Sequence, residues 1–271
     1  MQQEKDYVLG THDEEIARLG LQHRVWRPRA LDAWRRAGFT AGHTLLDIGC
    51  GPGYASADLA EIVGPSGRVH AVDRSGRFLH ALAQTSLQRG LANITMHEVD
   101  LNTSPLPEVQ VDGAWARWVF AFVAQPRKLL SDAARCVKPG GTIVIHEYFD
   151  YSTWRVVPQS AEVEEFVREA MESWRADGGE PDIGLEIPRW LHELGWQVET
   201  LHPIIDVVSP DNYVWQWPKT FLQVGIRRLV DLGRIPAQRA DIMQAAFDAR
   251  DVDPHALMFT PGVIEIIAVK Q

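Results

Sequence analysis

Three glycines at alternate positions form the most informative feature of the sequence. They lie in segment 45–54, which reads Leu-Leu-Asp-Ile-Gly-Cys-Gly-Pro-Gly-Tyr. An apolar run that ends in such glycines predicts a strand that turns directly into a helix. Glycine permits a positive φ at the turn, and its missing side chain lets a ligand approach the backbone closely. A tight turn without a ligand is the alternative interpretation.

A second candidate ligand group is Asp73, which ends the apolar segment 67–73. In open α/β sheets, ligands bind at the carboxyl ends of the strands. Asp73 is therefore placed to accept hydrogen bonds from ribose hydroxyls, although a helix-capping role would suit it as well. A nicotinamide dinucleotide site would need G-x-G-x-x-G. The sixth position of that pattern is Tyr54 here, so the sequence argues against a dinucleotide.

The spacing of apolar residues predicts strands that alternate with helices in the first 150 residues. Strands are expected over 44–49, 67–73, 93–99, 111–119 and 142–146, and helices over 54–63, 75–89 and 126–137. This alternation is typical of a parallel sheet covered on both faces. Ahead of it, Thr11 and Glu14 form a capping box and apolar residues recur at helical spacing over 16–34. Pro28 predicts a break, which would leave two helices before residue 40.

The last 120 residues predict helices over 160–176 and 187–194, a strand-like segment over 196–208 and a closing strand over 262–270. Between the last two strands, a helical region opens at Ser209-Pro210, breaks at Gly233 and restarts at Pro236. We interpret this insertion as a lid. The expected organisation is an N-terminal cap (1–40), a core (41–210 and 252–271) and a lid (211–251), all in one integrated domain.

In this order, the motifs resemble those of the class I S-adenosylmethionine-dependent methyltransferases. Segment 45–53 is similar to their glycine-rich first motif, Asp73 to their ribose-binding acid, and Asp100-Leu101 to the pair that contacts adenine. Segments 111–114 and 138–141 match the start of their fourth strand and the turn before their fifth. The leader, 7–10 and 19–26, is similar to that of the ubiquinone and menaquinone biosynthesis enzymes.

The resemblance implies a Rossmann-like, doubly wound α/β fold with a mostly parallel seven-stranded sheet, and S-adenosylmethionine as the cofactor. The implied cofactor-binding residues are Asp47, Gly49, Gly51, Gly53, Asp73, Asp100 and Leu101. Arg117 lies near the methionine end of that site, where it could pair with the cofactor carboxylate or with a local acid.

Catalytic groups are sought at the end of the fifth strand. Alternation places His146 and Tyr148 on one face and Glu147 on the other. We take His146 and Tyr148 as candidate catalytic residues, with a packed histidine as the alternative for His146. His23 is a candidate for the substrate pocket, whereas His12 and His202 are expected at structural or surface positions.

Ten tryptophans form an unusual excess. Trp154 follows the fifth strand, and Trp215 and Trp217 begin the insertion. Aromatic faces attract cations and could enclose a substrate beside the sulfonium, so we predict that these three line a substrate pocket. Packing within the core is the alternative.

Composition narrows the function classes. The chain has 271 residues, 45% of them hydrophobic, and a net charge of −9 from 27 basic and 36 acidic residues. The apolar fraction excludes a disordered chain, and two cysteines exclude a disulfide-stapled scaffold. The acidic balance argues against nucleic acid as a partner. No membrane-spanning run, signal peptide or zinc-ligand spacing is visible, so we expect a cytoplasmic protein without a metal, and we leave a homodimer open.

These observations predict a methyltransferase that acts on a small-molecule acceptor through an oxygen, nitrogen or carbon nucleophile. An RNA or protein methyltransferase, or a catalytically silent cofactor-binding module, is the alternative.

Overall fold

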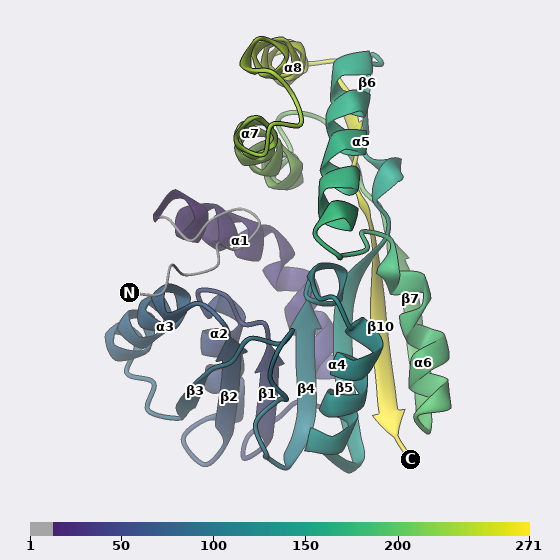
Figure 1. Cartoon of the computed structure of the whole chain (residues 1–271). Helices are drawn as coiled ribbons and strands as arrows, with labels where there is room; N and C mark the ends of the chain where they lie inside the picture. Colours follow the sequence, from purple (N-terminus) through teal and green to yellow (C-terminus); the bar gives the residue numbers. More distant parts are fainter. Residues whose placement is uncertain (1–12) are drawn as a thin grey trace.

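In the computed structural model, which describes residues 13–271, seven strands form one twisted sheet (Figure 1). They are β1 (Thr44–Ile48), β2 (Arg68–Asp73), β3 (Ile94–Glu98), β4 (Val111–Arg117), β5 (Val137–Asp150), β7 (Trp196–Ile204) and β10 (Gly262–Lys270). Their order is β3-β2-β1-β4-β5-β10-β7, and β10 alone runs antiparallel to its neighbours β5 and β7. The predicted mostly parallel, seven-stranded, doubly wound sheet is confirmed.

Helices cover both faces of this sheet. The α-helices of the described chain are α1 (Asp13–Arg36), α2 (Tyr54–Val63), α3 (Gly76–Arg89), α4 (Pro126–Cys136), α5 (Ala161–Ala176), α6 (Ile187–Glu193), α7 (Gln216–Asp231) and α8 (Ala237–Asp251), of which α7 and α8 belong to the insertion. Alternate strand residues point to opposite faces: Leu45 and Trp115 pack with α1 and α2, whereas Leu46 and Ile145 share a core with α4. Burial on both faces is what a parallel sheet requires.

Helix α1 differs from the prediction, because it continues through Pro28 for 24 residues. The predicted pair of helices is therefore wrong. An interior proline costs a helix about 3 kcal/mol. Here buried residues lie on both sides of it, Val25 and Trp26 before and Ala30 and Trp34 after. Burial along the whole helix outweighs the local cost.

The insertion stands above the carboxyl ends of the parallel strands, where Figure 1 shows α7 and α8 beside α5. A small second sheet, which the sequence did not predict, forms beside the insertion, in part from the segments that flank it. It joins β6 (Arg155–Val157), β9 (Leu257–Phe259) and β8 (Val207–Val208) in that order. Strands of two or three residues are too short to give a periodic signal. This sheet ties the two ends of the insertion to the chain that follows β5.

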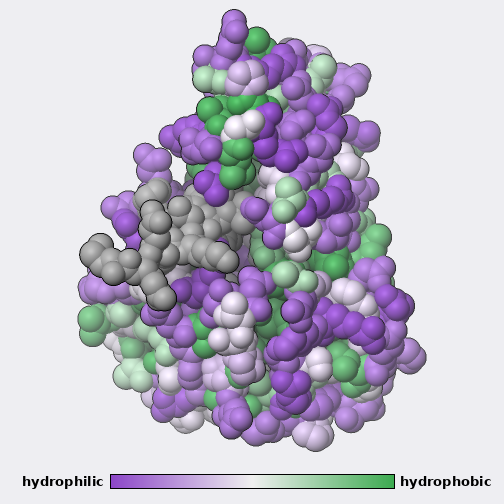
Figure 2. Space-filling model, in the orientation of Figure 1, coloured by the Kyte–Doolittle hydropathy of each residue, from purple (hydrophilic) through white to green (hydrophobic). Residues whose placement is uncertain are grey.

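Hydrophilic residues cover most of the face shown in Figure 2, and hydrophobic residues gather over α7. None of the helices within residues 13–271 combines the length and the hydropathy needed to cross a bilayer. The predicted cap at Thr11, the leader segment 7–10 and His12 lie outside the described residues.

Candidate functional site

A cavity of about 510 Å³ lies at the carboxyl ends of β1, β2 and β4. One wall consists of the strand ends and the glycine turn after β1. Helix α1, the end of α5 and α7 supply the opposite wall. Cavities of this size bind small molecules and cofactors.

The glycine turn has three positive φ angles, 66° at Gly49, 53° at Gly51 and 78° at Gly53. A methyl group at Gly49 would meet Val119 at 2.6 Å, and one at Gly53 would meet Leu82 at 2.3 Å. At Gly51 it would meet no described atom within 4 Å, and Gly51 lines the cavity. Packing therefore explains two of the glycines, whereas Gly51 presents bare backbone to the cavity.

Asp73 ends β2 at the cavity wall, with 8% of its surface exposed. One carboxylate oxygen accepts the N–H of Gly51 and the other accepts the N–H of Ser75, both at 2.9 Å. Burial raises the pKa of Asp73, while these two hydrogen bonds oppose the rise. Ser75, and not Asp73, caps α3 by accepting the N–H of Phe78 at 3.2 Å. The helix-capping alternative for Asp73 is thus unnecessary, and its oxygens keep lone pairs for a ligand.

The other predicted cofactor residues reach the same cavity, with one exception. Asp47 lies in its wall and accepts a hydrogen bond from Ser56 Oγ at 2.5 Å, and burial raises the pKa of Asp47 to about 7. Asp100 and Leu101 line the cavity beyond β3. Gly53 does not line it, because it faces Leu82.

Arg117 leaves the end of β4 and is held by a histidine from α1. Its Nη2 lies 3.2 Å from Nδ1 of His23, and Nε2 of His23 lies 3.1 Å from the carboxylate of Asp58 on α2. Arginine can only donate, so Nδ1 of His23 accepts from Arg117 and its Nε2 donates to Asp58. Burial lowers the pKa of His23, which favours this neutral ring. Nη1 of Arg117 is buried without a hydrogen-bond partner among residues 13–271. A guanidinium that faces a cavity with a buried, unpaired N–H donor is suited to bind the carboxylate of a ligand.

The structure does not bring His146 to the cavity. Its ring is fully buried, lies edge-on to Trp115 and places Nε2 3.0 Å from the carboxylate of Glu265 on β10. Glu147 points the other way and accepts the N–H groups of Val119 and Phe120 at 3.0 and 2.8 Å. Both side chains are committed to the fold, which corrects the expectation of a base at this strand end.

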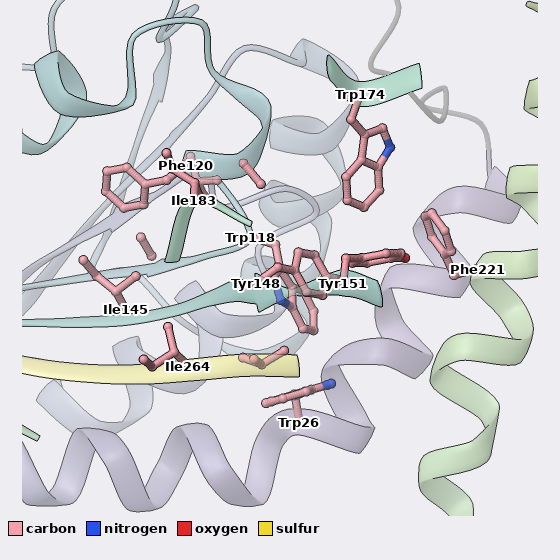
Figure 3. Packing of buried hydrophobic residues seen from close by; sticks show 14 of the residues in the cluster. Trp26, Trp118, Phe120, Ile145, Tyr148, Tyr151, Trp174, Ile183, Phe221 and Ile264 are labelled. Carbon is pink, nitrogen blue, oxygen red and sulfur yellow. The ribbon is translucent and has the colours of Figure 1, made fainter. Parts of the chain in front are cut away.

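Tyr148 packs in an aromatic stack beneath the cavity wall. Its ring lies 5.4 Å from that of Trp118, nearly parallel to it (Figure 3). The ring of Trp118 lies equally close to that of Trp217. Trp118 and, higher in the same cluster, Trp174 line the cavity, whereas Tyr148 does not.

The three predicted pocket tryptophans also pack away from the cavity lining. Trp154, Trp215 and Trp217 are each at most 2% exposed. Trp215 donates a hydrogen bond from Nε1 to Asp251 at 2.8 Å and packs on Phe247. Of the predicted substrate residues, only His23 lines the cavity.

Among the lining residues that the sequence did not predict are Trp118, Trp174 and Arg228. Trp118 is the only non-glycine residue with a positive φ within residues 13–271, at 52°. No local sequence motif predicts this conformation. Trp174 belongs to an amphipathic helix whose apolar face does not reveal what it covers. Arg228 gave a usable signal, because it is a charged residue among the inward-facing positions of α7.

The segment that carries the glycine turn and Asp73 matches a known domain. Residues 46–145 match the family model described as a methyltransferase domain. This match confirms the predicted resemblance to the class I S-adenosylmethionine-dependent methyltransferases. An uncharacterized protein in a transposon of Streptomyces fradiae is 31% identical over 200 residues, which is 72% of this chain and 55% of that protein. A demethylmenaquinone methyltransferase of a Geobacillus strain is 32% identical over 126 residues, 46% of this chain and 53% of that protein.

The methyltransferase fold extends over most of the chain. A solved S-adenosylmethionine-dependent methyltransferase from Thiobacillus denitrificans, in complex with S-adenosylhomocysteine, covers 90% of this chain and 91% of its own, with a TM-score of 0.53 and 18% identity. By contrast, the chain spans about half the length of the curated methyltransferases it matches. The match to those relatives therefore concerns the methyltransferase domain.

The residues present fit the family's cofactor. Bare backbone at Gly51, the fixed carboxylate of Asp73 and the unpartnered Nη1 of Arg117 all face one cavity. Gly51 allows a ligand to approach the backbone closely, Asp73 can accept hydrogen bonds from hydroxyls, and Arg117 can donate to a carboxylate. S-adenosylmethionine carries both ribose hydroxyls and a carboxylate.

Proposed function

We propose that this methyltransferase transfers a methyl group from S-adenosylmethionine to a small-molecule acceptor. The observation that carries this proposal is a single cavity whose lining combines the cofactor residues of the strand ends with side chains from α1, α5 and α7. A helical roof of this kind suits a small acceptor better than a nucleic acid or a protein, as does the charge of −9.

The chain's own residues position the reactants. Asp73 accepts hydrogen bonds from the ribose hydroxyls, and Asp100 with Leu101 bounds the adenine. Arg117, fixed by His23, binds the carboxylate of the methionine part. S-adenosylmethionine supplies an electrophilic methyl on its sulfonium, so alignment and exclusion of water are the protein's main tasks.

Aromatic side chains exclude water from the site. Trp115, Trp118 and Trp174 line the cavity and are nearly buried themselves, at 1%, 7% and 2% exposure. Their rings provide an apolar surface for an acceptor and a favourable environment for a sulfonium.

His23 is the one histidine of the described cavity lining, and its Nδ1 is engaged by Arg117. We therefore assign it the role of positioning Arg117. An acceptor that arrives as a free nucleophile, such as a neutral amine or an ionised oxygen or carbon acid, fits this site without a histidine base.

Calorimetry with S-adenosylmethionine, S-adenosylhomocysteine and NADH tests the cofactor, and we expect the first two to bind and NADH not to. Incubation of a metabolite panel with isotope-labelled cofactor then tests transfer, because a product gains the mass of one labelled methyl group. NADH binding without a signal from the sulfonium ligand would refute the proposal. Cofactor binding with no labelled product from any panel would favour a silent cofactor-binding module.

A further inference from the structure

Arg228 is a cation without a partner in the helical wall of the cavity. It is half-buried on α7, it lines the cavity, and its Nε is buried without a hydrogen-bond partner among residues 13–271. No ion pair joins it to any described residue. Its neighbour Arg227 is exposed and lies 3.6 Å from Glu14. An unpaired, partly desolvated guanidinium is costly unless a ligand supplies the missing anion.

The place of Arg228 separates it from the cofactor groups. It follows Phe221 and Gly225 at helical spacing, so the three lie on one side of α7. Phe221 packs against Trp174 of α5, with ring centroids 5.8 Å apart, and Trp174 lines the cavity. Arg228 thus belongs to the wall made by α5 and α7, whereas Arg117 belongs to the strand ends.

These two guanidiniums call for two anions. Arg117 is oriented by His23 beside the glycine turn, and the methionine carboxylate accounts for it. The cofactor has no second carboxylate, and its adenosine part is accounted for by Asp73, Asp100 and Leu101. Because no acid within residues 13–271 pairs with Arg228, we assign its anion to the other ligand of the cavity, the acceptor.

We propose that the acceptor is a small organic acid with an apolar or aromatic body, and that Arg228 binds its carboxylate. This inference rests on the proposed methyl transfer. The Nε–H and one Nη–H of an arginine form a planar fork that matches the two oxygens of a carboxylate. Asp177 is the lining acid nearest in sequence to Trp174 on the same wall. A lining that offers one guanidinium and one acid on this wall suits a singly charged group better than a phosphate dianion.

The test uses the full chain saturated with S-adenosylhomocysteine, so that only the acceptor region is free. Phenylacetate, indole-3-acetate and octanoate are titrated by calorimetry, each against its methyl ester, and phenyl phosphate is added as a dianion. The variant is Arg228→Gln. The matched control is Arg227→Gln, which makes the same change one residue along on the outer side of α7.

We expect at least one acid to bind at least tenfold more tightly than its ester. Arg228→Gln should weaken that acid about ten- to hundredfold, as the loss of a charge-assisted hydrogen bond predicts. It should leave the ester, S-adenosylhomocysteine and the melting temperature unchanged, and Arg227→Gln should change none of them. Arg228→Lys should recover part of the loss.

Four results would overturn the inference. The first is that no acid binds more tightly than its ester. The second is that phenyl phosphate binds more tightly than every acid, and the third is that Arg228→Gln loses affinity for S-adenosylhomocysteine. The fourth is an equal loss of binding in Asp177→Lys and Arg228→Gln that affects the acids and their uncharged esters alike. The proposed function fails separately, in the first titration, if S-adenosylhomocysteine does not bind to the unaltered chain.

Discussion

Replacement of Gly51 by alanine separates a ligand-binding glycine from a merely structural one. The new methyl group would meet no described atom within 4 Å, so no clash arises within the protein. The backbone N–H that Asp73 accepts is retained. The cost to stability is then the left-handed conformation alone, with φ at 53°, about 1–2 kcal/mol for a residue that carries a Cβ.

The cost to the cofactor is of a different kind, because the methyl group occupies the space that the ligand needs. Forcing one extra carbon into a packed contact costs typically 1–3 kcal/mol, so we expect cofactor affinity to fall about ten- to hundredfold. Calorimetry with S-adenosylhomocysteine measures the affinity, and urea denaturation measures the stability.

Two other glycines serve as controls. Gly90, at the end of α3, has φ at 66° and open space around it, so Gly90→Ala should show the same loss of stability with normal affinity. Gly53→Ala should be destabilised further, because its methyl group would lie 2.3 Å from Leu82. A folded Gly51→Ala variant that binds S-adenosylhomocysteine as tightly as the unaltered chain would refute the reasoning.

Three further predictions follow from the same geometry. Asp73→Ala should lower cofactor affinity roughly ten- to hundredfold, and calorimetry showing a change within twofold would reduce Asp73 to a structural residue. Although burial opposes ionisation, hydrogen bonds from His23 and Arg27 hold the pKa of Asp58 at about 2. Its stabilisation of about 2 kcal/mol is therefore present above about pH 4 and lost as the pH falls to about 2. The gap in unfolding free energy between the unaltered chain and Asp58→Asn should narrow over that range, and a constant gap would contradict the assignment. Trp217→Ala should lower the unfolding free energy by about 3–5 kcal/mol, whereas normal stability with impaired turnover would return Trp217 to the substrate pocket.

The parts of the fold that the sequence predicted are those with local signals. Alternating apolar segments and the glycine turn locate β1, β2 and the helices between the strands, because each pattern is complete within about ten residues. Pro28 misled the prediction, since the packing of Trp26 and Trp34 that offsets its cost is not a local property. The second sheet was missed because its strands are too short to show a period.

The candidate site divides in the same way. Asp73, Asp100 and Gly51 could be found because their place at a strand end follows from the sequence. Residue type could not separate lining tryptophans from packing ones, since both are apolar and aromatic. The charge of Arg228 among the inward-facing positions of α7 could have marked it, but the sequence does not show that the insertion folds back over the strand ends and so brings it to the cavity.

Besides Arg228, the turn after β4 gives the insertion a second connection to the cavity. Trp118 holds a left-handed backbone, at a cost of about 1–2 kcal/mol. The turn is fixed where Glu147 accepts the following N–H groups, and burial raises the pKa of that carboxyl to about 7. Trp118 then presents one face to Trp217 of α7 and lines the cavity itself. The stack therefore joins the packing of α7 to a wall of the cavity, so a residue that only packs can still set the shape in which an acceptor is held.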